Sequence, residues 1–245
     1  MDLGIQGRRA LVFGGSRGLG RAVAAALAAE GVRVCIAARD PERLQAAQAA
    51  AGAELALPCD LTQPGAAKAL VDDVVRQWGG VDILVLNTGG PAKAAFADVD
   101  EAAWLAGFQT LWLAAVAAIQ AALPGMRAQN WGRVLLVTSV AAKEPMSALT
   151  VSNGLRAGLL GLAKSLADEV AVDGVTVNAL LPGYTRTERL IELGVTDAQV
   201  AAQVPARRLG TPEEFAAVAA FLASERAAYV TGQAVAIDGG WLRGM

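Results

Sequence analysis

Short apolar runs alternate along the chain with longer alanine-rich segments of helical character. Seven runs of β-branched and aliphatic residues predict strands near 8–14, 32–38, 54–58, 82–87, 132–139, 174–181 and 233–238. The segments between them predict helices near 18–30, 41–51, 64–78, 101–122, 151–171 and 211–224. Because the strands are apolar throughout rather than at alternate positions, we expect them to be buried on both faces. The pattern predicts an α/β fold: a single doubly wound, Rossmann-type domain over residues 1–245, with about seven parallel strands and helices on both faces.

Two helix starts carry capping patterns. In "GTPEEF", Thr211 is the expected N-cap, Pro212 the first helical residue and Glu214 the residue that closes a capping box. "VTDAQV" has the same spacing from Thr196 and predicts a short helix inside the long connection 182–210. A connection of this length is typical of a functional lid over a substrate pocket.

The segment from Trp104 to Met126 is apolar and carries no charge. About 20 apolar residues can span a bilayer, but Gln109 and Gln120 interrupt this run. A helix that is apolar all round can instead be buried on both sides. We therefore expect it to pack against the sheet on one side and against another subunit on the other, with no membrane contact.

Composition excludes several kinds of site. The formal net charge is −2 without a basic run, which argues against a nucleic-acid partner. The absence of histidine excludes imidazole acid–base catalysis and histidine-ligated metals. The two cysteines, Cys35 and Cys59, stand in apolar surroundings and are expected to be reduced, buried thiols of a cytoplasmic protein. The first residues show no signal-peptide pattern.

A glycine-rich stretch, "GGSRGLG", lies between the first strand and the first helix. Backbone amides in such a loop can approach a pyrophosphate closely, and the start of the helix favours its negative charge. The spacing is G-x-x-x-G-x-G rather than G-x-G-x-x-G, but the strand–loop–helix context is the required one. The residues expected to bind the dinucleotide here are Gly14, Ser16, Arg17, Gly18, Leu19 and Gly20.

The end of the second strand indicates which dinucleotide is bound. An acidic residue there is typical of NAD sites, where it binds the ribose hydroxyls. This strand ends "CIAARD", which places Arg39 near the adenosine ribose, with Arg17 in the glycine loop. Two guanidinium groups suit a 2′-phosphate, so the sequence predicts NADP(H). A solvated surface position for Arg39, with Asp40 on the ribose hydroxyls, is the alternative.

Taken together, the motifs resemble those of the short-chain dehydrogenase/reductase family. The resemblance covers essentially the whole chain and rests on "GGSRGLG", "CDLT", "ILVLNTGG", "VTS", "VNALLPGYTRTE" and "YVTGQAVAIDGGW" in their order. It implies an NAD(P)-binding α/β sandwich that forms dimers or tetramers. Among members, the chain looks most like 3-oxoacyl-carrier-protein reductases and related ketoreductases.

The resemblance also assigns further cofactor contacts. It implies that the adenine and its ribose, then the nicotinamide half, are bound by Asp60, Leu61, Asn87, Gly89, Pro182, Gly183 and Thr187. The chain departs from the family at Phe13, where a threonine is usual, and at Leu86 and Thr88 within the usual Asn-Asn-Ala-Gly.

The family's catalytic pattern is altered. A serine follows the fifth strand, a tyrosine comes thirteen residues later and a lysine four further; here these positions hold Ser139, Ser152 and Arg156. The family's fourth member, an asparagine in the preceding helix, falls near Leu111 or Thr110.

The replacements change the available acid–base chemistry. Tyrosine can protonate the carbonyl oxygen because its pKa, about 10, is lowered by a nearby ammonium group. Serine is a far weaker acid, and loss of general-acid help costs about 10²–10⁴ in rate. Ser139 can still donate a hydrogen bond to an alkoxide, while Arg156 supplies fixed charge and can reach the nicotinamide ribose. Tyr184, in "LPGYTRTE", is the best replacement acid, with a pocket-wall role as its alternative.

Three functions therefore remain open. The first is an NADP(H)-dependent oxidoreductase that reduces a small or acyl carbonyl substrate, or oxidises the alcohol. The second is an NADP(H)-binding sensor or silent subunit with little redox activity. The third is a lyase or dehydratase on the same scaffold.

Overall fold

All seven predicted strands are present in the computed structural model, which describes residues 1–192 and 194–244. The strands are β1 (Arg9–Phe13), β2 (Arg33–Ala38), β3 (Leu55–Pro58), β4 (Ile83–Leu86), β5 (Gly132–Val137), β6 (Val175–Pro182) and β7 (Ala234–Ile237). They form one parallel sheet in the order β3-β2-β1-β4-β5-β6-β7. The predicted Rossmann-type fold is confirmed.

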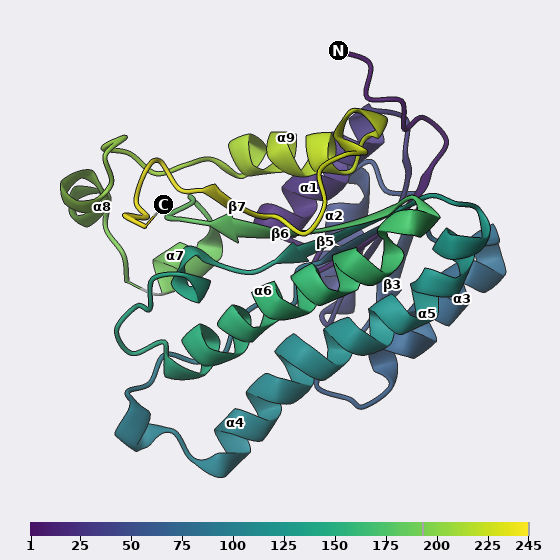
Figure 1. Cartoon of the computed structure of the whole chain (residues 1–245). Helices are drawn as coiled ribbons and strands as arrows, with labels where there is room; N and C mark the ends of the chain where they lie inside the picture. Colours follow the sequence, from purple (N-terminus) through teal and green to yellow (C-terminus); the bar gives the residue numbers. More distant parts are fainter. Residues whose placement is uncertain (193, 245) are drawn as a thin grey trace.

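Helices cover both faces of the sheet (Figure 1). One face carries α1 (Gly18–Ala29), α2 (Pro41–Ala50) and α9 (Pro212–Leu222); the other carries α3 (Ala66–Trp78), α5 (Ala114–Ala128) and α6 (Thr150–Val170). Successive strand residues point to opposite faces. Accordingly, Leu11 packs with the α3–α5–α6 layer and Val12 with the α1–α9 layer, both fully buried. Burial on both faces explains why the strands are apolar throughout.

The long apolar segment forms α4 (Glu101–Phe108), a π-helical turn η2 (Gln109–Leu113) and α5. Within the described residues, Glu101–Ala128 is the one helix long and apolar enough to cross a bilayer, a test that core helices also pass. One side is buried against the core, as expected. The other side exposes Leu105, Phe108 and Leu113.

The 182–210 connection contains α7 (Glu188–Glu192) and α8 (Asp197–Gln203). Thr196 and Thr211 both form the predicted capping boxes, with Gln199 and Glu214 respectively. Helix α7 has no predicted counterpart, and Leu193 lies outside the described residues. Short helical turns complete the described chain: η1 (Phe96–Asp98), η3 (Val140–Ala142), η4 (Ala171–Asp173) and η5 (Glu225–Ala227).

The strand order reverses between β1 and β4, where the connections leave toward opposite edges of the sheet. Ligands of doubly wound sheets bind at the carboxyl ends of the strands beside such a reversal. The loops after these two strands meet there, because Asn87 Nδ2 donates a hydrogen bond to the carbonyl of Gly14 at 3.3 Å. We therefore expect a ligand to bind at the carboxyl edge of the sheet, beside β1 and β4.

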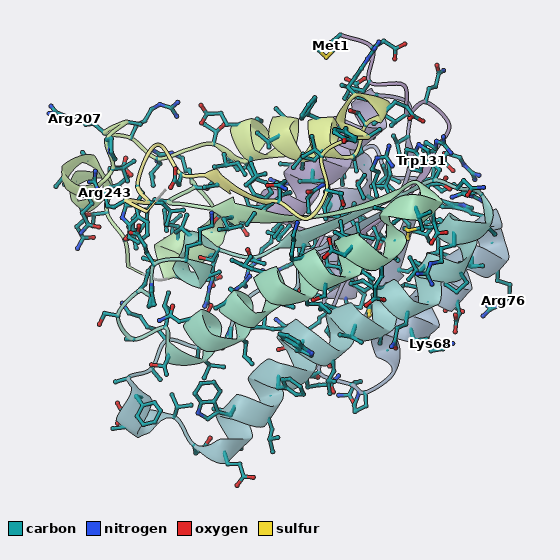
Figure 2. The ribbon with its side chains drawn as sticks, viewed as in Figure 1. Met1, Lys68, Arg76, Trp131, Arg207 and Arg243 are labelled. Carbon is teal, nitrogen blue, oxygen red and sulfur yellow. The ribbon has the colours of Figure 1, made fainter. Side chains whose placement is uncertain are left out.

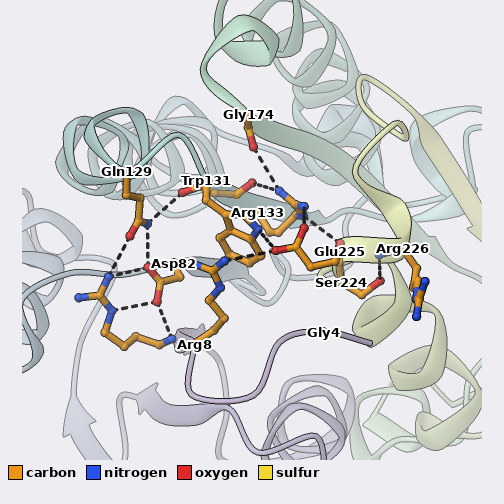
Figure 3. Close-up of polar contacts among 12 residues, drawn as sticks. Gly4, Arg8, Asp82, Gln129, Trp131, Arg133, Gly174, Ser224, Glu225 and Arg226 are labelled. Atoms are coloured by element: carbon orange, nitrogen blue, oxygen red, sulfur yellow. Dashed lines mark hydrogen bonds and ion pairs between the residues drawn. The ribbon is translucent and has the colours of Figure 1, made fainter. Parts of the chain in front are cut away.

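The opposite, amino edge of the sheet holds a polar network (Figure 3). Arg133 is 1% exposed and donates to the carbonyls of Ser224, Gly132 and Gly174. Its guanidinium lies 4.3 Å from the Trp131 ring centroid, and Trp131 donates to Glu225 at 2.6 Å. A second set at this edge consists of Arg9, Asp82 and Gln129, joined by hydrogen bonds.

Candidate active site

The loop between β1 and α1 requires glycine for steric reasons. Gly14 and Gly18 have φ of +63° and +52°, in the region that L side chains rarely adopt. A Cβ on Gly20 would press on the carbonyl of Gly14, and a Cβ on Gly14 on that of Asn87. No side chain caps α1 and no acidic residue occupies its first turn. The helix start is therefore free to receive an anion.

Arg17 extends from this loop to the lid. Its Nη1 lies 2.7 Å from Glu192 and 3.4 Å from Glu188, both on α7. The hydrogen bond with Glu192 is the main cause that raises the pKa of Arg17. The lid contacts the loop a second time at Thr187, whose Cγ2 would be 3.3 Å from a Cβ on Gly18. The structure thus brings Arg17, Gly18 and Thr187 together.

The residues after β2 and β3 follow the two strands on one side of β1, where the adenosine is expected. Arg39 is exposed there. Asp40 caps α2 by accepting from the backbone amides of Glu42 and Arg43, each at 3.1 Å. This engagement makes Asp40 a poor candidate for the ribose hydroxyls.

Asp60 lies after β3 and is held by its own loop. The hydroxyl of Thr62 donates to its carboxylate at 2.8 Å, and this bond is the main cause that lowers the pKa of Asp60. The carbonyl of the next residue, Leu61, accepts from Gln109 at 3.4 Å. Gly183, after β6, donates its amide to the carbonyl of Ile237 at 3.0 Å, immediately beyond Pro182.

Ser152 and Arg156, the residues predicted at the family's tyrosine and lysine positions, meet in the first turns of α6. Arg156 Nε donates to Ser152 Oγ at 3.1 Å, and its Nη1 donates to the carbonyls of Val137 and Thr138 at 3.0 and 2.7 Å. Its Nη2 donates to the carbonyl of Gly89. The guanidinium therefore ties α6 to the ends of both β4 and β5.

Arg156 is a buried positive charge without a carboxylate partner in the part of the chain that the structure describes. It is 8% exposed and takes part in no salt bridge among the described residues. Burial, together with the positive charge of Arg189, lowers the pKa of Arg156 to about 10. Such a pKa still leaves the side chain charged at neutral pH. A buried charge without a carboxylate partner is costly.

Ser139 lies immediately after the strand end that Arg156 holds, and its Oγ accepts from the amide of Ala141 at 3.1 Å. The turn that follows it, η3, packs against α6. Near the family's asparagine position, Leu111 is buried and Thr110 donates its hydroxyl to the carbonyl of Ala106 at 2.8 Å. Neither residue offers an amide side chain to the site.

Tyr184 lies at the start of the lid. Its hydroxyl is 3.3 Å from Gln203 Oε1, and its ring meets that of Trp241 edge-on at 6.1 Å between centroids. Burial raises the pKa of Tyr184, which makes it a weaker acid. Its role as the proton donor stays a prediction, and these contacts fit the pocket-wall alternative.

Sequence reasoning missed the part that Arg189 plays. This side chain, on α7, donates from Nη2 to the carbonyl of Pro91 at 2.9 Å. It therefore bridges the lid and the loop after β4. The only sequence signal was the run of charges in "TRTERLIE", which does not show which way each side chain points.

Comparisons with known proteins identify the family of the chain. Residues 14–242 match the protein-family model described as "Enoyl-(Acyl carrier protein) reductase". The chain is 35% identical over 240 residues to the 3-oxoacyl-(acyl-carrier-protein) reductase of Escherichia coli, covering 97% of this chain and 98% of that protein.

Two solved structures extend the comparison. L-sorbose reductase of Gluconobacter frateurii, in complex with NADPH and L-sorbose, superposes with a TM-score of 0.94 at 32% identity over 100% of both chains. An NADPH-bound short-chain oxidoreductase of Pseudomonas aeruginosa, described as containing an atypical catalytic center, has a TM-score of 0.88 at 32% identity, covering 97% of this chain and 98% of that one. The matched family model, the extent of identity and the shared fold show that the chain belongs to the short-chain dehydrogenase/reductase family.

Proposed function

We propose that this protein is an NADPH-dependent reductase of a small or acyl carbonyl substrate, carried by one domain, with an altered catalytic tetrad. The observation that carries the proposal is the buried contact between Arg156 and Ser152 at the carboxyl ends of β4 and β5. It supports the proposal because Arg156, which donates to the hydroxyl of Ser152, also donates to the carbonyl of Thr138, the residue before Ser139. The oxidation of an alcohol is the same reaction in reverse.

NADP(H) is supported as the cofactor by the chain's own residues and by its relatives. The glycine loop and the uncapped start of α1 suit a pyrophosphate. Arg39, exposed after β2, and Arg17, in the loop, are the side chains that we propose for the 2′-phosphate. The compared L-sorbose reductase and the Pseudomonas oxidoreductase were both solved with NADPH.

Bound NADPH would supply the hydride that reduces the carbonyl carbon. The protein must then stabilise and protonate the resulting alkoxide oxygen. Ser139 donates a hydrogen bond to this oxygen. Because Arg156 Nε already donates to Ser152 Oγ, the Ser152 hydroxyl hydrogen is free to be given to the alkoxide, and water restores it. The charge of Arg156 stabilises both oxyanions.

The Pseudomonas neighbour supports an active rather than a decayed site, since it too is described as having an atypical catalytic center. The second candidate, an NADP(H)-binding protein with little redox activity, is favoured by the loss of an amide at both Leu111 and Thr110. A lyase or dehydratase role is the third.

NADPH oxidation with a panel of ketones, oxo acids and oxo thioesters tests the proposal. We expect turnover by the wild-type protein and a loss of about 10²-fold in Ser139→Ala, because an oxyanion donor contributes about this much. Tight NADPH binding without oxidation of the cofactor by any substrate would favour the sensor or silent-subunit alternative.

A double variant tests whether Ser152 and Arg156 weaken the family's catalytic activity. If Ser152 and Arg156 form a weakened tetrad, Ser152→Tyr combined with Arg156→Lys should raise turnover of simple ketones, by up to about 10²-fold. No gain in a folded, NADPH-binding double variant would mean that the pocket has been rebuilt for other chemistry.

We further propose a cytoplasmic homo-dimer or homo-tetramer without nucleic-acid or membrane partners. The apolar side of the helix 101–128 exposes Leu105 at 60% and Leu113 at 44%, which suits a subunit contact. Sedimentation of the purified protein tests the assembly.

A further inference from the structure

We infer that the substrate carries a carboxylate close to its carbonyl group, and that Arg156 and Arg189 bind this carboxylate across Gly90. The inference rests on the proposed reductase function, because it names the class of substrate that the same site accepts. The predicted substrates are short oxo acids.

Two guanidinium groups converge on the loop after β4. Arg156 Nη2 donates to the carbonyl of Gly89, and Arg189 Nη2 donates to that of Pro91. The residue between these two carbonyls is Gly90. A Cβ placed on Gly90 would be 3.5 Å from Arg156 Nη2 and 3.9 Å from Arg189 Nη2. The two donors therefore face one small space, which is open because Gly90 is exposed and has no side chain.

Each of these nitrogens has a hydrogen left to donate. Arg156 has five N–H groups, and four are used: one by Ser152, two by Val137 and Thr138, and one by Gly89. The fifth is on Nη2, beside Gly90. Arg189 Nη2 likewise uses one of its two N–H groups on Pro91. A carboxylate has two oxygens and can accept one hydrogen bond from each arginine.

The local charge also favours an anion. Arg156 is more than nine-tenths buried and has no carboxylate within salt-bridge distance among the described residues. The nearest acidic partner of Arg189 is Glu192, at 3.5 Å, and Glu192 is closer to Arg17, at 2.7 Å. Arg189 thus shares one carboxylate with Arg17, and Arg156 has none, so the space that they face is left with an excess of positive charge. A bound anion would balance it.

The position of the guanidinium limits the length of the substrate. Nε of Arg156 touches Ser152, where the carbonyl is reduced, and Nη2 of the same guanidinium faces Gly90. These two nitrogens are bonded to one carbon atom. A carboxylate at Nη2 and a carbonyl at Ser152 must therefore be directly bonded, as in 2-oxo acids, or separated by about one carbon atom, as in 3-oxo acids.

Paired substrates test the inference. NADPH oxidation is followed with 2-oxobutyrate, acetoacetate and the methyl ester of each. We expect kcat/KM for the acids to exceed that for the esters at least about tenfold, because charge-assisted hydrogen bonds are lost in the esters. Arg189→Gln should reduce the preference about 10- to 100-fold while leaving turnover of the esters in place.

Two further variants separate recognition of the carboxylate from the folding of the lid. Arg186→Gln is the matched control, because Arg186 precedes α7 and pairs with Asp197 instead, at 3.1 Å; it should keep the preference for acids. Gly90→Ala places a methyl group between the guanidiniums at ordinary contact distance. It should fold normally and lose the preference.

A binding measurement distinguishes the inference from the proposed function. Calorimetry of the NADP-loaded protein should show binding of the acids and not of the esters, with the acid signal lost in Arg189→Gln. Binding of this kind without turnover supports the carboxylate inference and contradicts the reductase. Equal binding or turnover of acids and esters overturns the inference and leaves the reductase standing. A fall in NADPH affinity, rather than acid affinity, in Arg189→Gln would also overturn it.

Discussion

Strand β5 has a buried arginine at each end, and the two are held in opposite ways. Arg133 is the second residue of the strand, and Arg156 donates to the carbonyl of its last residue, Val137; the two arginines are 1% and 8% exposed. Burial is the main cause that lowers the pKa of both. Arg133 has Glu225 at 3.8 Å and the ring of Trp131 beside it. Arg156 donates hydrogen bonds to carbonyls and to one hydroxyl, and the nearby charge of Arg189 has the same sign as its own.

The difference separates structure from function. The charge of Arg133 has a carboxylate partner within the protein, Glu225, which it shares with Arg8. The charge of Arg156 is not balanced by the described residues, so a ligand is the partner it lacks. Figure 2 shows the two ends apart, with Trp131 at one end and Arg243, beside the lid, at the other. We therefore expect Arg133, at the amino edge of the sheet, to stabilise the fold, and Arg156, at the carboxyl edge, to bind a ligand.

Stability should separate the two arginines most strongly. Arg133→Met removes the partner of three carbonyls and of Glu225, and should lower the free energy of unfolding by about 3–5 kcal/mol. Arg156→Met also leaves three carbonyls without their donor, but it relieves an unbalanced buried charge and should cost less, about 1–2 kcal/mol. Urea unfolding of the cofactor-free proteins measures both. Equal losses would contradict the comparison.

Cofactor preference should respond only at the carboxyl edge. Arg39→Ala should reduce the preference for NADPH over NADH about 10- to 100-fold, since charge-assisted bonds to the 2′-phosphate are lost. Arg43→Ala is the control, because Arg43 pairs with Asp40 at 3.2 Å on the exposed side of α2. Fluorescence titration with both cofactors checks this. Equal wild-type affinities, or an unchanged preference in Arg39→Ala, would be incompatible with an NADP site.

Acid should weaken the amino edge. Burial raises the pKa of Asp82, but hydrogen bonds from Arg9 and Gln129 outweigh it, so the folded pKa lies below its ordinary value. A depressed carboxyl pKa gives stability above the unfolded pKa of about 4, and this is lost as pH falls below it. Asp82→Asn should cost about 1–2 kcal/mol at pH 6 and lose less on acidification. Asp73→Asn, at the exposed pair with Arg76, is the control and should lose as much stability on acidification as the wild type. An equal loss of stability on acidification in the wild type and in Asp82→Asn would contradict this role of Asp82.

The smallest effect is expected at the pair between the loop and the lid. Glu192→Gln releases Arg17 from its nearest carboxylate and should tighten NADPH binding about two- to fivefold, as expected of an exposed pair. The gain should disappear at high salt, because exposed charges are screened. Titrations at two salt concentrations measure it, and a gain that persists at high salt would point to a different cause.

The fold was predictable because it depends on patterns that repeat. Continuous apolar strands, alanine-rich helices and the capping boxes at Thr196 and Thr211 each report a local preference that the packed structure keeps. The positions of Ser139, Ser152 and Arg156 followed from counting along the family's pattern. The positions of these residues fit the spacing of the family's pattern, but Ser152 and Arg156 differ in residue type from the family's tyrosine and lysine.

The charge balance of the site was not predictable. The hydrogen bonds of Arg156 to Val137, Thr138 and Gly89 join three separate elements, and sequence spacing does not determine side-chain direction across them. Helix α7 is five residues long, too short for a clear hydrophobic period. Because α7 was not predicted, no sequence pattern indicated that Arg189 lies close to Gly90.

The most direct test of the central claim is single-turnover hydride transfer from bound NADPH to an oxo acid, compared between the wild-type protein and Arg156→Met. The account predicts that the variant folds and binds NADPH within about tenfold of the wild type, but transfers hydride at least about 10²-fold more slowly, since it lacks the charge that stabilises the oxyanion. Equal rates in the two proteins would contradict it.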